Sequence, residues 1–185
     1  MVALGVYRTF AEGSSLVERK TGLLNADDRS FVVDPPLAEA SRLQPIVAYW
    51  EQKRGSRPMP LRKDIDPLEL KEHLRMIFLV DALRGDEFRF RLLGSEIVER
   101  YGRNSTGKTV RETYCEMPDI ARWCTEMFKA VIDSKRPVLA QGSLRSVRKD
   151  FFSFEAIALP LSRDGEQADM IFGAVHYTAQ PRRRS

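Results

Sequence analysis

The longest regular pattern of apolar positions lies in the second half of the chain. Between Pro118 and Pro137, apolar residues recur at the spacing of one helix face: Ile120, Trp123, Cys124, Met127, Phe128 and Val131. Proline is tolerated in the first turn of a helix and cannot continue one, so the pattern predicts a helix over 118–136. A shorter stripe of the same kind predicts an amphipathic helix that ends near Gly55: Leu43, Ile46, Val47 and Trp50.

Alternation and short apolar runs predict five strands. The apolar run 76–80 and the alternating segment 88–92 flank the turn Arg84-Gly85-Asp86, which indicates an antiparallel hairpin. Short polar connections separate three further strands and predict two more hairpins: 138–147, 151–161 and 170–177.

A short helix is predicted between the amphipathic helix and the first hairpin. Asp66 is a good N-cap, Pro67 suits the first helical position, and Glu69 has the spacing of a capping box. These signals predict a helix over 67–74. Because strands, then helices, then strands follow one another along the chain, we expect an α+β fold with an antiparallel sheet.

Composition narrows the class of protein. The chain has 185 residues, 43% hydrophobic and 30% charged, which is typical of a single globular domain. Its 30 basic residues face 26 acidic ones, and the one dense basic run is Arg182–Arg184. A nucleic-acid-binding protein concentrates positive charge on one face. The interspersed charges disfavour such a regulator, which stays open as an alternative.

The sequence carries few signals of export or metal chemistry. No apolar run reaches the roughly 18–20 residues of a membrane span, and the N-terminus lacks the layout of a signal peptide. Cys115 and Cys124 are too widely spaced for a CxxC motif, and the histidines are His73 and His176. We therefore expect a cytoplasmic protein with reduced thiols and no metal site. No pattern of catalytic residues rises above chance, so we expect no enzymatic activity.

The segment 102–109, GRNSTGKT, fits the phosphate-binding pattern G-x-x-x-x-G-K-[ST]. A true P-loop leaves a buried strand and opens into a long helix. Here Ser95 caps a predicted helix over 96–101, for which Gly102 is a left-handed stop. Only nine residues separate Lys108 from Pro118. A nucleotide-binding enzyme that uses this loop is thus an alternative that the context disfavours.

Several motifs resemble those of a bacterial PAS subfamily. They are, in chain order, P-x-R-x-D-I-D-P (60–67) after the helix with Trp50, an apolar strand ending at Asp81, FRFRLLGSEI (88–97), Y-G-x-x-x-T-G-K (101–108) and PLSRDG (160–165). The resemblance covers roughly residues 40–177. It implies a five-stranded antiparallel sheet with helices on one face, here with an extra N-terminal amphipathic helix.

The pattern and the resemblance together divide the chain. Residues 1–36 show no sustained period and would be a flexible or loosely packed extension, 37–178 the PAS domain with its flanking helix, and 179–185 a basic tail. The loop after the first short helix would pass over a ligand pocket. Light-sensing flavin relatives carry a cysteine where Ser105 stands, and haem-binding relatives carry a histidine on the long helix, which has none here. Flavin-adduct chemistry and haem are therefore disfavoured, and the ligand is left unnamed.

Candidate site residues follow from this fold. Those of the pocket are Arg91, Tyr101, Trp123, Phe128, Phe154 and His176. Arg91 would anchor an acidic ligand if it faced the helices, and would be unremarkable if it faced solvent. The aromatic side chains would wall an apolar cavity or simply fill the core.

Trp50, Arg62 and Asp64 are candidates for contacts with a partner or for closing the pocket. The simpler interpretation of Arg62 and Asp64 is a loop ion pair or cap that holds the N-terminal helix on the core.

The resemblance leads to the hypothesis of a non-enzymatic sensory or interaction module in bacterial signalling. A small ligand or a signalling protein would favour one packing of the helices on the sheet. The flanking helix would report that change, and it would also support a homodimer.

Overall fold

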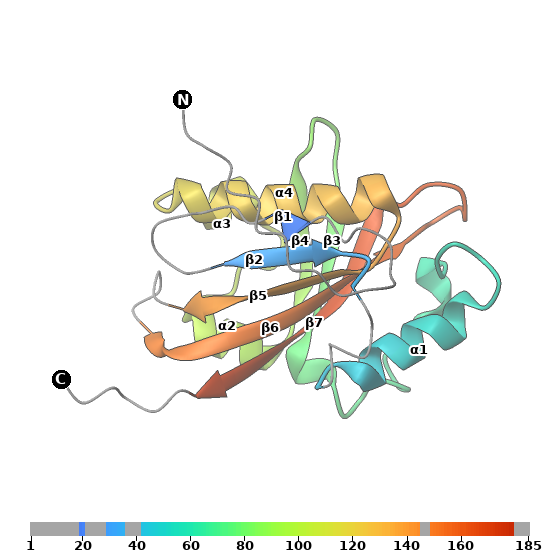
Figure 1. Ribbon diagram of the computed structural model, residues 1–185, viewed down its shortest axis with the longest axis horizontal. Coiled ribbons are helices and arrows are strands. Elements are labelled where there is room, and N and C mark those ends of the chain that lie inside the picture. The colour runs from blue at the N-terminus through green and yellow to red at the C-terminus, as the bar shows by residue number, and fades with distance from the viewer. Residues whose placement is uncertain (1–18, 21–28, 36–41, 145–148, 180–185) are drawn as a thin grey trace, which may run out of the picture.

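The computed structural model describes residues 19–20, 29–35, 42–144 and 149–179 (Figure 1). The elements are, in chain order, β1 (Arg19–Lys20), β2 (Ser30–Val33), α1 (Gln44–Arg54), the 3-10 turns η2 (Arg62–Asp64) and η3 (Leu74–Met76), β3 (Ile77–Ala82), β4 (Phe88–Leu93), α2 (Ser95–Tyr101), α3 (Val110–Thr113), α4 (Pro118–Ser134), β5 (Val138–Leu144), β6 (Lys149–Leu161) and β7 (Met170–Ala179). The α+β class and the long helix after Pro118 are confirmed. Helix α3 lies in a stretch without a clear pattern and was not predicted.

A single antiparallel sheet has the strand order β1-β2-β5-β6-β7-β3-β4. The five predicted strands form the block from β5 to β4, and the three predicted hairpins are present. The prediction of five strands was too low, because residues 19–20 and 30–33 form two further strands, β1 and β2. Strand β2 pairs with β5 from Ser30–Gln141 to Val33–Val138. It covers backbone groups that an open edge would leave unpaired, so this part of the predicted extension is a strand.

The central strands are buried on both faces of the sheet. In β7, each residue from Met170 to Ala174 is buried. Ile171 packs in one core with α4, whereas Phe172 packs in a second core with α1. Successive side chains of a strand point to opposite faces, so the two helices cover opposite sides of the sheet (Figure 1). The prediction placed the helices on one face, with α1 as an addition, and did not assign α1 to the other face.

Helix α1 is fixed to the sheet by its apolar stripe. Leu43, Ile46, Val47 and Trp50 are all buried in the core on that face. The indole N–H of Trp50 donates to the carbonyl oxygen of Pro160 in β6 at 2.9 Å. A buried indole N–H is costly without such a partner. The hydrogen bond therefore fixes both the position and the rotation of α1.

The helix predicted over 67–74 does not form. Its place is taken by separate turns, in which Leu70, His73 and Met76 each donate to the carbonyl three residues earlier. A capping box would need the Glu69 carboxylate to reach the N–H of Asp66. That N–H donates instead to the Tyr49 hydroxyl at 2.8 Å, and Glu69 forms an ion pair with Lys53 at 2.7 Å. Contacts with α1 thus replace the local cap.

No helix in the described residues is both long and apolar enough to cross a membrane.

Gly173 in β7 permits the closest packing in the sheet. A Cβ atom built at this position would overlap both the carbonyl oxygen of Ile157 in β6 and the ring of Phe78 in β3. One of these neighbours is backbone and the other is a buried ring, so neither can move aside cheaply. The position therefore requires glycine for space.

We expect Gly173→Ala to lower the free energy of unfolding by at least about 2 kcal/mol, because an overpacked core must shift backbone or side chains. Urea unfolding followed by circular dichroism measures the change. Thr178→Ala, at an exposed position of the same strand, is the control and should change stability by less than about 0.5 kcal/mol. Equal stability of Gly173→Ala and the parent chain would contradict this packing.

Candidate functional site

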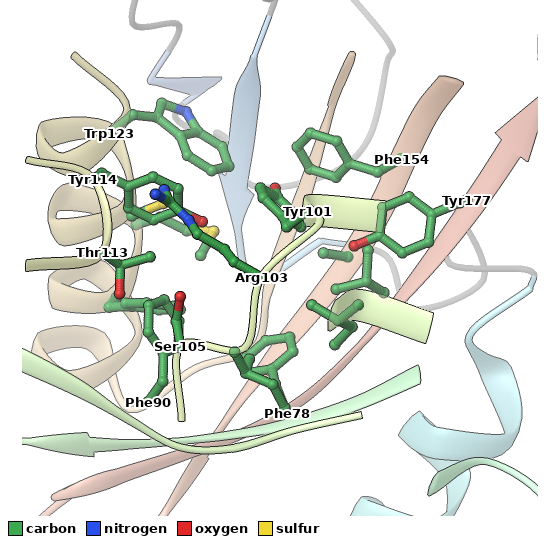
Figure 2. Close-up of a pocket in the computed structure, with 17 residues that line it drawn as sticks. Phe78, Phe90, Tyr101, Arg103, Ser105, Thr113, Tyr114, Trp123, Phe154 and Tyr177 are labelled. Carbon is green, nitrogen blue, oxygen red and sulfur yellow. The ribbon is translucent and has the colours of Figure 1, made fainter. Parts of the chain in front are cut away.

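A cavity of about 80 Å³ lies between the sheet and the helices on the α4 face (Figure 2). Its walls come from β3, β4, β6 and β7 on one side and from α2, α3, α4 and the loop 102–109 on the other. The lining residues are Phe78, Phe90, Leu93, Ile97, Tyr101, Arg103, Ser105, Thr113, Tyr114, Trp123, Cys124, Met127, Phe128, Phe154, Ala156, Val175 and Tyr177. Most are aromatic or aliphatic, so the cavity is an apolar site with a few polar groups.

Rings that meet at steep angles leave this space open. Trp123 meets Phe154 with ring centroids 6.2 Å apart and an interplanar angle of 73°. Tyr114 meets Phe90 at 78° and Tyr101 at 67°. Edge-to-face contacts are favourable between aromatic rings, but flat rings held at these angles do not fill a core as branched side chains do. The rings therefore wall the cavity, and the space between them remains unfilled.

The N-terminal segment supports the back of the cavity. The ring of Phe31 in β2 meets Trp123 edge-on, with centroids 6.3 Å apart. The guanidinium of Arg29 lies 5.3 Å from the centroid of Trp123 and 5.4 Å from that of Phe154. Arg29 is only 3% exposed. Contacts of this kind between a cation and an aromatic ring are favourable, and they tie β2 to the cavity wall.

Four of the six predicted pocket residues line the cavity: Tyr101, Trp123, Phe128 and Phe154. They come from α2, α4 and β6, so the fold brings together side chains that are far apart in the sequence. The prediction missed the two residues of the loop, Arg103 and Ser105. Ser105 is buried, with 3% of its surface exposed.

Arg91 does not line the cavity. Strand β4 turns Phe88 and Phe90 toward the cavity side and Arg91 toward the other face, where its side chain is 54% exposed. There it lies 3.5 Å from the carboxylate of Asp81, which also accepts hydrogen bonds from Arg89 and Arg163. Asp81 is buried, so Arg91 supports a structural carboxylate rather than a ligand.

His176 is also not a lining residue, and the reason is the period of a strand. Tyr177 pairs with Phe154 across β6 and β7, whereas His176 pairs with Glu155. Adjacent residues of a strand face opposite sides of the sheet. Tyr177 therefore lines the cavity, one position after the predicted residue His176.

The residues predicted for loop or interface contacts lie on the α1 side. Trp50 is 3% exposed and belongs to the core of its own chain, so it is no free interface residue. Asp64 forms an ion pair with Arg57 at 2.7 Å, not with Arg62. Burial alone would raise the pKa of Asp64, but hydrogen bonds from the Leu61 N–H and from Arg57 outweigh it and lower the pKa. Asp64 thus fits the simpler interpretation, in which a charged side chain holds the loop in place, but its ion-pair partner is Arg57.

The loop 102–109 lacks the geometry of a P-loop. It follows helix α2, and Gly102 ends that helix with φ 73°. The N–H of Gly107 donates to the carbonyl of Phe90 at 2.7 Å, so the loop is bound to strand β4. Thr109 is the N-cap of α3, a helix of four residues, and forms a capping box with Glu112. These N–H groups serve the fold and do not converge on a phosphate site.

Three buried polar atoms of lining residues have no hydrogen-bond partner within the described part of the chain: Thr113 Oγ1, Trp123 Nε1 and Tyr177 Oη. Figure 2 shows the Tyr177 hydroxyl directed toward the interior of the cavity. Burial raises the pKa of Tyr177, and the nearby Tyr101 and Glu96 raise it further, so the phenol stays protonated and can donate. Buried polar groups without partners are rare in folded proteins. Of the three, the Tyr177 hydroxyl is the one that the cavity offers as a hydrogen-bond donor.

Among the residues that the structure describes, no three His, Cys, Asp or Glu side chains converge as a metal site requires.

Comparison with known protein families gives one match. A family model described as PAS domain matches residues 38–176, about three quarters of the chain. No curated protein and no solved structure gives a significant match.

The two cysteines should differ in reactivity. Burial raises the pKa of the Cys124 thiol to about 11, although the charge of Arg29 lowers it, whereas Cys115 is exposed. At pH 8 the thiolate of Cys124 is then on the order of one part in a thousand. We expect iodoacetamide to alkylate only Cys115 in the folded protein and both cysteines in denaturant, as mass spectrometry would show. Rapid modification of Cys124 in the folded chain would contradict the burial of this side chain in the cavity wall.

The raised pKa of Cys124 also predicts that the free energy of unfolding falls at alkaline pH. Its pKa in the folded chain, about 11, lies above the ordinary 9.0 of the unfolded chain. The folded state therefore holds this proton more tightly, and stability falls as pH rises from 9 toward 11. At pH 10 the loss from this group is about 1.4 kcal/mol. Urea unfolding at pH 8 and at pH 10 measures how much stability is lost between the two pH values. This loss should be smaller in Cys124→Ala than in the parent chain by about that amount. Identical pH dependence in the two proteins would contradict the shift.

Proposed function

The chain belongs to the PAS domain family, and from this premise we propose that it is a non-enzymatic sensory or interaction module of a signalling pathway. The observation that carries the proposal is the apolar cavity between the sheet and α4. Its size lies well below the roughly 300–1,000 Å³ of most ligand pockets. The ligand is accordingly a small molecule of at most about one ring, and a large cofactor does not fit the walls as they stand.

Helix α4 is positioned to transmit occupancy of the cavity. Its middle turns supply Trp123, Met127 and Phe128 to the cavity wall. One turn further on, Ile132 packs against both the core on the cavity side and the core around α1. A ligand that moves α4 therefore also changes the packing of α1. A ligand shifts such an equilibrium only by its difference in affinity for the two arrangements.

In this proposal the chain acts in the cytoplasm and passes its signal to another protein. A signalling protein would read the relative positions of α1 and α4. Homodimerisation stays part of the proposal, but the buried stripe of α1 is used within the chain, so a dimer would need another surface. The loop 102–109 acts in this scheme as one wall of the sensor.

We expect the chain to bind small single-ring probes such as toluene or phenol, and Ala156→Leu to lose that binding by more than tenfold. Ala156 lines the cavity, so the larger side chain fills the space that the probe would occupy. Ligand-detected NMR titration measures the affinity, and circular dichroism checks that the variant is folded.

Ala48→Leu is the matched control, because Ala48 is exposed on α1. Val175→Ile adds only one methylene to the wall and should weaken binding in a chain that remains folded. The sensor proposal fails if the parent chain binds none of the probes, or if Ala156→Leu binds them as tightly as the parent.

A further inference from the structure

The cavity carries a positive charge at its mouth. Arg103 is the one charged side chain among its lining residues, and no acidic residue lines it. The guanidinium lies 5.7 Å from the centroid of the Tyr114 ring. It forms neither an ion pair nor a hydrogen bond with any of the described residues. A guanidinium that has no acidic partner among the described residues is available to bind an anion at this opening.

The local backbone holds Arg103 in this place. Gly102 ends α2 in a left-handed conformation, and Gly107 is bonded to Phe90 of β4. The loop between them therefore has both ends fixed. Figure 2 shows Arg103 extending from this loop across the cavity toward Tyr114. Because the side chain is exposed as a whole, its head group lies at the boundary between the cavity and solvent.

A second cation lies behind the opposite wall. Arg29 is buried between Trp123 and Phe154, and its charge opposes the effect of burial on Tyr114 and Cys124. The charge thus reaches the groups that face the cavity. Tyr177 adds a protonated hydroxyl without a partner in the described residues, directed inward. Arg103 at the mouth and the inward Tyr177 hydroxyl thus face a space whose walls are mostly apolar, and Arg29 lies behind one of these walls.

The size of the cavity limits the apolar part of a ligand. At about 80 Å³ it has roughly half the volume of an engineered cavity of about 150 Å³ that binds benzene. A short aliphatic chain fits inside, and a single ring fits if part of it occupies the mouth. The polar end of such a molecule then lies beside Arg103, whose planar head can bind both oxygens of a carboxylate.

We propose that the cavity binds a small monocarboxylate, with the short chain or single ring inside and the carboxylate paired with Arg103 at the mouth. This inference rests on the proposed sensory function and names the chemistry of its ligand. Arg103 then selects anions over neutral molecules of the same shape, while the aromatic walls limit their size.

The test compares each acid with its neutral amide on the full chain at low ionic strength. Benzoate and butyrate are the anions, and benzamide and butyramide are the matched neutral probes. Ligand-detected NMR titration should give at least tenfold tighter binding for the anions. Arg103→Gln should reduce that preference to less than twofold. Arg111→Gln removes an exposed arginine of α3 outside the cavity and should leave the preference unchanged.

Each outcome separates this inference from the proposed function. Tenfold preference that survives in Arg103→Gln, or equal binding of acid and amide by the parent chain, overturns the carboxylate site but leaves the sensor. Benzoate binding that persists in Ala156→Leu places the anion elsewhere and also overturns it. If neither the acids nor the neutral probes bind the parent chain, the sensory function fails as well.

Discussion

Burial of both faces of the central strands is the constraint on which the rest of this structure depends. A strand such as β7, apolar at five consecutive positions, needs a cover on each side of the sheet. Helix α1 and the turns after it cover one side, and α2, α3 and α4 cover the other. The α1 side is closed mainly by branched side chains around Phe172. The apolar cavity lies on the α4 side, where aromatic rings meet edge to face.

The polar groups are distributed between the two sides in different ways. On the α1 side the buried carboxylate of Asp81 has three arginine partners, and the Trp50 indole has the carbonyl of Pro160. On the cavity side, the Tyr177 and Thr113 hydroxyls have no partner in the described residues. The α1 side also holds buried atoms without a partner in the described residues, Arg54 Nε and Glu155 Oε1, so the Tyr177 hydroxyl is distinguished by its direction, into the cavity.

Strand β2 and the residue before it connect the N-terminal part of the chain to the cavity wall. Strand β2 protects the edge of β5, and the same segment places Phe31 and Arg29 against the Trp123 ring. The edge of the sheet and the wall of the cavity thus share residues. The cavity wall therefore contacts β2 through Trp123, and α4 reaches the core around α1 through Ile132.

Local patterns in the sequence determined α1, α2 and α4, the hairpins and the antiparallel class, because periodicity and turn residues act over a few neighbouring positions. The fold implied by the family resemblance led to Trp123, Phe128, Phe154 and Tyr101, which line the cavity. Tertiary structure decided the rest. Strand register, set by pairing across the sheet, put Tyr177 rather than His176 in the cavity and turned Arg91 away from it. Contacts with α1 replaced the local cap at Asp66, and β5 recruited β2, because in each case the partner lies far away in the sequence.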